Sequence, residues 1–143
     1  MRETERRINT IKNLIQGSRV GNNPRISAII DDLNEVIHVS TINPERRKRL
    51  FKIIHMSRGF DSFLSEYSGE RNRSLGHYLI TISQQGRRTS TGTVLDVQFY
   101  QREIVDKRNR FMHEAGSYPA GELEVNRIIS EIDNCISIVV RFY

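Results

Sequence analysis

The residues with the clearest chemical potential lie between Arg108 and His113, in the segment Arg-Asn-Arg-Phe-Met-His. An imidazole has an unperturbed pKa of about 6.5, so it can both accept and donate a proton near neutral pH. A guanidinium keeps its positive charge and presents a planar fork of donors that matches phosphate oxygens. Arg108 and His113, with the Asn109 amide beside them, can therefore support phosphodiester cleavage without a metal ion.

The spacing of these residues decides which of them can meet on one helix. Positions five apart on an ideal α-helix differ by about 140° in direction and about 7.5 Å along the axis, so Arg108 and His113 do not share a face. Asn109 and His113 are four apart, which places the amide where it can hydrogen-bond the imidazole and fix its tautomer. Arg108 can reach a histidine only through an irregular helix start or through a second copy in a two-fold dimer.

The Arg-Asn-x-x-x-His pattern, near the end of a small helical chain, resembles the HEPN superfamily of nucleotide-binding domains. The match rests on Arg108, Asn109 and His113. The resemblance implies a metal-independent endoribonuclease that works as a homodimer with a composite active site and needs no cofactor. In such an enzyme the 2′-hydroxyl of RNA attacks the adjacent phosphorus, which leaves a 2′,3′-cyclic phosphate and a 5′-hydroxyl.

The resemblance also implies a role for each motif residue. His113 is expected to act as acid or base, Arg108 to stabilise charge on the phosphoryl oxygens, and Asn109 to orient its neighbour. Arg110 is expected to touch the RNA backbone or the partner subunit, with a solvated helix position as the alternative. Some toxin members have a tyrosine two positions after the histidine, which a partner antitoxin modifies. Ala115 stands there in this chain, which argues against that mode of control.

Apolar residues recur at helical spacing along most of the chain, which predicts an all-α fold. We expect one domain over residues 1–143, a bundle of about five to six helices with a long C-terminal helix. Gly17 ends the first helix, and Pro24 lies in the first turn of the second. Asn43 is a natural N-cap for a third helix with Pro44 at its first position, and Gly59 predicts a kink or break in it.

The second half of the chain shows the same pattern. Ser74 is expected to cap a helix that stops near Gly86, followed by a loop rich in hydroxyl side chains. The motif then lies on a helix, or on a helix with an interruption, that ends at Gly116. The last helix carries a continuous apolar stripe wide enough for a core position. Its members are Val125, Ile128, Ile129, Ile132, Cys135, Ile136, Val139 and Val140.

The charge balance favours a polyanionic partner. The chain has 22 Lys and Arg residues against 17 Asp and Glu residues, and a formal net charge of +5. The densest basic stretch lies between Arg46 and Lys52, and we expect it to contact the RNA backbone or to form a solvated helix face. Its members assigned to RNA binding are Arg46, Arg47, Arg49 and Lys52.

Other classes of site find little support. One cysteine and no metal-ligand spacing predict a reducing compartment and no metal site. The N-terminus lacks the apolar stretch of a signal peptide, and no window approaches the roughly 20 apolar residues of a membrane span, so we expect a cytoplasmic protein. The remaining histidines, His38, His55 and His77, have no neighbours comparable to those of His113.

Three functions remain open at this point. The first is a HEPN ribonuclease that acts as a toxin or antiviral defence effector, with an antitoxin or regulator as a partner. The second is a catalytically silent HEPN module that binds RNA or nucleotide, or that dimerises as an adaptor. The third is a basic helical DNA-binding protein, for which no convincing helix-turn-helix spacing is present.

Overall fold

The computed structural model describes residues 3–38 and 45–143, apart from the side chain of Arg46, and contains helices and loops without a strand in those ranges. The predicted all-α fold with a long C-terminal helix is therefore confirmed. The helices are α1 (Glu3–Gln16), α2 (Ile26–His38), α3 (Glu45–Ser68), α4 (Leu75–Gln85), α5 (Val97–Tyr100), the π-helical η2 (Gln101–Val105), α6 (Asp106–His113) and α7 (Glu122–Phe142).

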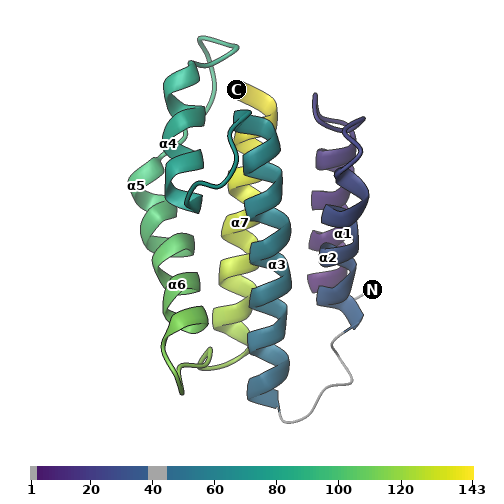
Figure 1. Cartoon of the computed structure of the whole chain (residues 1–143), viewed down its shortest axis with the longest axis vertical. Coiled ribbons are helices and arrows are strands. Elements are labelled where there is room, and N and C mark those ends of the chain that lie inside the picture. The colour runs from purple at the N-terminus through teal and green to yellow at the C-terminus, as the bar shows by residue number, and fades with distance from the viewer. Residues whose placement is uncertain (1–2, 39–44) are drawn as a thin grey trace.

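The two longest helices, α3 and α7, lie at the centre of the bundle (Figure 1). Helices α1 and α2 cover one side, whereas α4, α5, η2 and α6 cover the other. The buried apolar residues form one cluster that draws on both sides. Each stripe residue of α7 from Val125 to Val139 is buried, as its periodicity predicts, and Val140 is partly buried. Burial of this stripe is the main favourable term that holds α7 in the centre.

Two predicted helix starts can be compared with the structure, and a third cannot. Ser74 caps α4, because its hydroxyl accepts a hydrogen bond from the backbone N–H of His77 at 3.1 Å. Helix α2 begins at Ile26, two residues later than the position of Pro24 suggests. The reason is a turn at Asn23, whose side-chain oxygen accepts from the Arg25 N–H at 2.9 Å. The predicted cap at residues 43–44 lies outside the described residues.

The predicted kink or break at Gly59 is wrong, because α3 runs through this position as one helix from Glu45 to Ser68. The glycine instead allows α2 to approach closely. A Cβ atom at residue 59 would lie 3.1 Å from Cδ2 of Leu33 and 3.6 Å from the carbonyl oxygen of Ile29. The missing side chain therefore makes room for a neighbouring helix rather than for a bend.

Of the two alternatives for the motif helix, continuous or interrupted, the structure shows the interrupted one, with a π-helical turn. Asp96 caps the start of α5 by accepting from the Phe99 N–H at 3.0 Å. The Asp106 N–H then bonds the carbonyl of Gln101, five residues earlier, before regular α-helix resumes in α6. The predicted end of this helix is close to the observed one, since α6 ends at His113 and Gly116 has a positive φ of 80°.

Candidate functional site

A pocket of about 500 Å³ lies between the middle of α3, the first turn of α4 and the η2–α6 helix. Its walls include Asp61 from α3, Arg73 from the loop before α4, His77 from α4, and Arg108 and Asn109 from α6. Two residues that the sequence assigned to catalysis therefore meet three residues that it did not. We call this cavity the Arg108 pocket.

The Arg108 guanidinium is held from two sides. One terminal nitrogen donates to the Asn109 side-chain oxygen at 2.8 Å, and the other lies 3.8 Å from a carboxylate oxygen of Asp61. The Arg108 side chain is only 18% exposed. Its Nε is buried, and no residue in the described ranges accepts a hydrogen bond from it. The side chain is thus positioned and retains donor capacity for an acceptor in the pocket.

Asp61, on the α3 wall of this pocket, has a shifted pKa. Burial raises the pKa of its carboxyl group, and the positive charge of Arg108 opposes that shift without cancelling it. The carboxylate therefore contributes less to the stability of the fold than its pairing with Arg108 suggests.

His113 does not join the other two motif residues. The π turn ends before Asp106, so the helix from Arg108 to His113 is regular and the two side chains diverge as ideal geometry predicts. His113 is exposed at the last residue of α6 and does not line the Arg108 pocket. The π turn is therefore not an irregular helix start that brings Arg108 and His113 together within one chain.

The predicted contact between Asn109 and His113 is also wrong. The Asn109 oxygen accepts from Arg108, and no hydrogen bond joins the amide to His113 within the ranges that the structure describes. The physical reason is competition, because the guanidinium of the neighbouring Arg108 is a charged donor and forms a strong hydrogen bond with the amide oxygen. Asn109 orients Arg108 instead.

The basic residues assigned to RNA binding lie away from the pocket, at the end of the bundle where α3 begins and α7 begins (Figure 1). Arg49 and Lys52 contact the Glu122 carboxylate at 3.6 and 3.5 Å, and their side chains are 24% and 13% exposed. Arg110 is exposed and lies 3.3 Å from a Glu124 oxygen. These three arginine and lysine side chains therefore have intramolecular partners.

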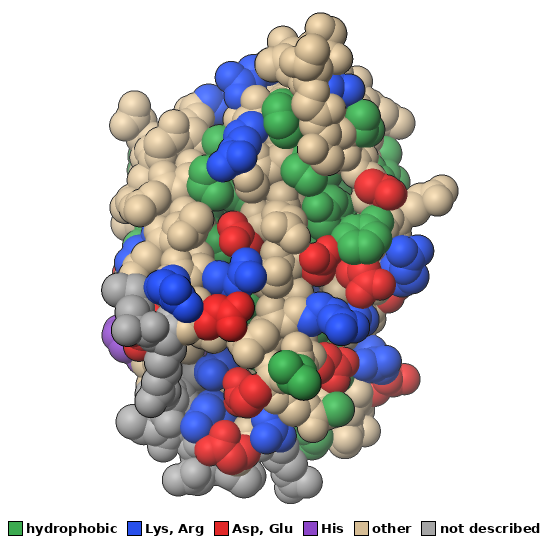
Figure 2. Space-filling model, turned by 180° about the vertical axis from the view of Figure 1, so that it is seen from behind, with side chains coloured by type: hydrophobic (Ala, Val, Ile, Leu, Met, Phe, Trp, Pro, Cys, Tyr) green, Lys and Arg blue, Asp and Glu red, His purple; other side chains and the backbone are tan. Residues whose placement is uncertain are grey.

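Two further members of this basic stretch differ from the rest. Arg47 is exposed on the first turn of α3, whereas the side chain of Arg46 is outside the described part of the chain. On the rear face of the molecule, Lys and Arg side chains alternate with Asp and Glu side chains rather than form a continuous basic surface (Figure 2). The net positive charge is thus distributed, and it does not by itself mark a nucleic-acid interface on that face.

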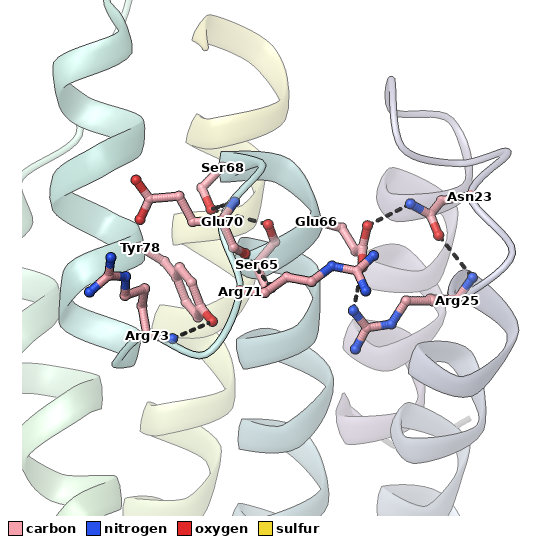
Figure 3. A network of polar contacts seen from close by, with 9 residues as sticks. All are labelled: Asn23, Arg25, Ser65, Glu66, Ser68, Glu70, Arg71, Arg73 and Tyr78. Atoms are coloured by element: carbon pink, nitrogen blue, oxygen red, sulfur yellow. Dashed lines mark hydrogen bonds and ion pairs between the residues drawn. The ribbon is translucent and has the colours of Figure 1, made fainter.

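The loop between α3 and α4 positions Arg73 and His77, two pocket residues that the sequence did not assign to the site. The Ser65 hydroxyl donates to the Glu70 carbonyl at 2.6 Å, and the Arg73 N–H donates to the Tyr78 hydroxyl at 3.1 Å (Figure 3). His77, on the first turn of α4, contacts Glu70 through Nε2 at 2.5 Å. Only the loop's polar composition and the Ser74 cap hinted that this segment is ordered.

Two findings bear on cofactors and membranes. Over the described residues, no group of three or more His, Cys, Asp or Glu side chains is arranged to hold a metal ion. No helix in the same parts of the chain is long and apolar enough to cross a membrane.

Comparisons of the chain with protein-family models, with curated proteins and with solved structures found no match. The assignment of a function therefore depends on the chemistry of the Arg108 pocket and of His113.

Proposed function

We propose that the chain is a metal-independent endoribonuclease of the HEPN type, which cleaves RNA by attack of the 2′-hydroxyl on the adjacent phosphorus. The observation that carries this proposal is the placement of Arg108. Its guanidinium lines a pocket of about 500 Å³, is held by Asn109 and Asp61, and keeps a buried Nε–H without an acceptor in the described residues. A phosphate oxygen in the pocket can accept from the terminal N–H groups of Arg108 that the contacts with Asn109 and Asp61 leave unused.

The reaction needs proton transfer as well as charge stabilisation. Arg108 stabilises the negative charge that builds on the phosphoryl oxygens, and such preorganised electrostatic help is often the largest single catalytic term. His113 supplies acid or base chemistry with an imidazole that is exposed at the end of α6. The product is a 2′,3′-cyclic phosphate on one fragment and a 5′-hydroxyl on the other.

A second copy of the chain completes the site in this proposal. Arg108 and His113 diverge on one regular helix, so one chain does not bring them together. A two-fold dimer pairs the same surface of both copies, which brings His113 of one copy toward the Arg108 pocket of the other. The exposed Arg110, one turn before His113, then lies near the same contact.

The biological setting follows from the resemblance alone. A HEPN ribonuclease of this kind acts in the cytoplasm as a toxin or as an antiviral defence effector, and it requires a regulator or antitoxin that restrains it. The basic residues Arg46, Arg47, Arg49 and Lys52 are proposed to contact the RNA backbone. For Arg49 and Lys52 this contact requires release from Glu122, so the exposed Arg47 is the strongest candidate of the four for contact with RNA.

Cleavage of labelled RNA in excess EDTA tests the proposal directly. We expect wild-type protein to produce 2′,3′-cyclic phosphate ends. His113→Ala should lower the cleavage rate by about 10²-fold or more, since a proton-transfer group contributes that much. Arg108→Ala should lower the cleavage rate by about 10²- to 10³-fold. His38→Ala and Arg102→Ala, whose side chains are 68% and 65% exposed elsewhere, are the matched controls and should cleave normally.

Two outcomes would contradict the proposal. Cleavage that requires magnesium would exclude the metal-independent mechanism. Absence of cleavage on any RNA, with circular dichroism showing a folded helical protein, would exclude the enzyme. The second result favours the silent adaptor, for which a specific observation exists: the Arg108 pocket can hold an anion without His113, because His113 is not among its walls.

A further inference from the structure

The Arg108 pocket contains an imidazole of its own, which is His77 rather than His113. We propose that His77 is the general base of this pocket, which takes the proton from the attacking 2′-hydroxyl of an RNA phosphodiester held by Arg108 and Arg73. The inference rests on the proposed ribonuclease function and names the base that acts at the same site.

His77 is fixed at the mouth of the pocket by the start of α4. Its backbone N–H donates to the capping hydroxyl of Ser74 at 3.1 Å, which sets the position of the residue on the first helical turn. The His77 side chain is 42% exposed, so it is reached by solvent and by a ligand from outside. The neighbouring walls carry Arg73 and Arg108, both of which offer donors to a phosphate.

Glu70 orients the imidazole. Its Oε2 lies 2.5 Å from Nε2 of His77, and the backbone that carries Glu70 is itself held on α3. The Ser65 hydroxyl donates to the Glu70 carbonyl at 2.6 Å, and the Glu70 N–H donates to the Ser68 hydroxyl at 3.2 Å. Figure 3 shows the Glu70 and Arg73 side chains extending from this loop toward α4. The carboxylate and the imidazole are thus positioned before a substrate arrives.

This arrangement determines which nitrogen can act. When Nε2 carries the proton and donates a hydrogen bond to Glu70, Nδ1 is the unprotonated nitrogen and can accept a proton. Nδ1 takes the proton of the 2′-hydroxyl as the O2′–P bond forms, and the P–O5′ bond breaks. The departing 5′-oxygen takes a proton from the imidazolium of His113 on a second copy of the chain. The carboxylate of Glu70 stabilises the positive charge that His77 gains in this step.

The charged groups that surround His77 come from three elements. Glu70 and Arg73 belong to the loop before α4, Asp61 belongs to α3 and Arg108 belongs to α6. The η2 turn contributes the neutral Gln101 to the same walls. A general base must be unprotonated to act, so kcat/KM should fall toward acid pH, and His77 should be the cause of that fall.

The experiment compares RNA cleavage in EDTA by wild-type protein, His77→Gln, Glu70→Gln and His38→Gln across pH 5 to 9. We expect His77→Gln to lower kcat/KM by about 10²-fold or more and to abolish the fall on the acid side. Glu70→Gln should lower kcat/KM less than His77→Gln does, and it should alter the acid side of the same pH profile, because a neutral amide does not stabilise the imidazolium. His38→Gln should match wild type, since His38 lies on α2 and outside the pocket.

A second measurement follows His77 without relying on activity. Titration of the wild-type protein with uridine 3′-monophosphate, monitored by NMR of the imidazole Hε1 signals, should shift the His77 resonance. It should leave His38 unmoved, and Arg108→Ala should abolish the shift. The His77→Gln and His38→Gln variants assign the two resonances.

Each outcome decides a different question. If wild-type protein cleaves RNA and His77→Gln keeps both the rate and the pH profile of His38→Gln, the role of His77 is overturned while the ribonuclease stands. If wild-type protein cleaves no RNA in EDTA, the ribonuclease fails and the role of His77 fails with it. A nucleotide that binds without shifting the His77 resonance also overturns the role of His77.

Discussion

The Arg108 side chain is held in place at its terminal nitrogens but keeps one donor without a partner in the described parts of the chain. Asn109 and Asp61 hold the terminal nitrogens, whereas the buried Nε finds no acceptor in the described residues. A buried donor without a partner costs about 1 to 3 kcal/mol. The Nε atoms of Arg49 and Arg87 are also buried without an acceptor in the described residues, so it is the pocket around Arg108, and not this cost alone, that marks the site.

Protonation of the Asp61 carboxyl, which lies beside Arg108, makes the stability of the fold depend on pH. The raised pKa of the Asp61 carboxyl means that the folded chain binds the proton more tightly than the unfolded chain does. Its contribution to the free energy of unfolding is therefore largest at low pH, and it declines as pH rises from about the ordinary value of 3.8 through the raised pKa of the folded state.

Asp61→Asn should remove that decline. We expect the free energy of unfolding of the variant, relative to wild type, to increase between pH 4 and pH 7, as measured by urea denaturation at each pH. Asp31→Asn, on the exposed face of α2, is the matched control. A variant that instead loses stability relative to wild type as pH rises would mean that the attraction to Arg108 outweighs the cost of burial.

At the scale of elements, the contact between α2 and α3 depends on a missing side chain. The closest neighbour of a Cβ at residue 59 would be Leu33, which is completely buried. A glycine in the middle of a helix costs about 0.5 to 1 kcal/mol in helix propensity relative to alanine. The close approach of two apolar helix faces offsets that cost, which explains why α3 continues without a bend.

Gly59→Val should destabilise the fold by about 2 kcal/mol, because the branched side chain overlaps Leu33 and the α2 backbone. Adding Leu33→Ala should relieve the overlap, so that the double variant loses less stability than the sum of the single variants, by about 0.5 to 3 kcal/mol. The readout is chemical denaturation of all four proteins.

The control for this cycle uses Ile82→Ala, a buried position on α4, which lies on the other side of α3 from α2 (Figure 1). The stability lost through Ile82→Ala should add to the stability lost through Gly59→Val within about 0.5 kcal/mol. Equal coupling to Leu33 and to Ile82 would show that residue 59 disturbs the bundle generally rather than the α2 contact.

At the scale of the whole molecule, the question is whether one chain is sufficient. A regular α6 directs Arg108 into its pocket and leaves His113 exposed at the end of the helix. If two copies form the site, each dimer contains two composite sites, and each site takes Arg108 from one copy and His113 from the other.

Mixing two inactive variants tests this arrangement. Equal amounts of Arg108→Ala and His113→Ala, allowed to exchange subunits, should recover about a quarter of wild-type cleavage, because half of the dimers are mixed and each retains one complete site. Arg108→Ala mixed with the double variant should stay inactive. Light scattering should give wild-type protein a mass of two chains. A strictly monomeric protein that still cleaves RNA would refute the composite site.

The sequence by itself determined the features that depend on local spacing. Helical periodicity predicted the all-α fold and the buried stripe of α7, and the residue type of Ser74 predicted its cap, and the structure confirms each of them. These features could be predicted because each is set by residues within a few turns of one another.

Only the tertiary structure decided which distant residues share a pocket. Asp61, His77 and Arg108 meet because α3, α4 and α6 pack together, and no local pattern specifies that contact. The same packing shows that Gly59 lies beneath Leu33 rather than at a bend, and that Asn109 contacts Arg108 rather than His113. Spacing along the chain identifies side chains that can do chemistry, but long-range burial and charge select the ones that face each other.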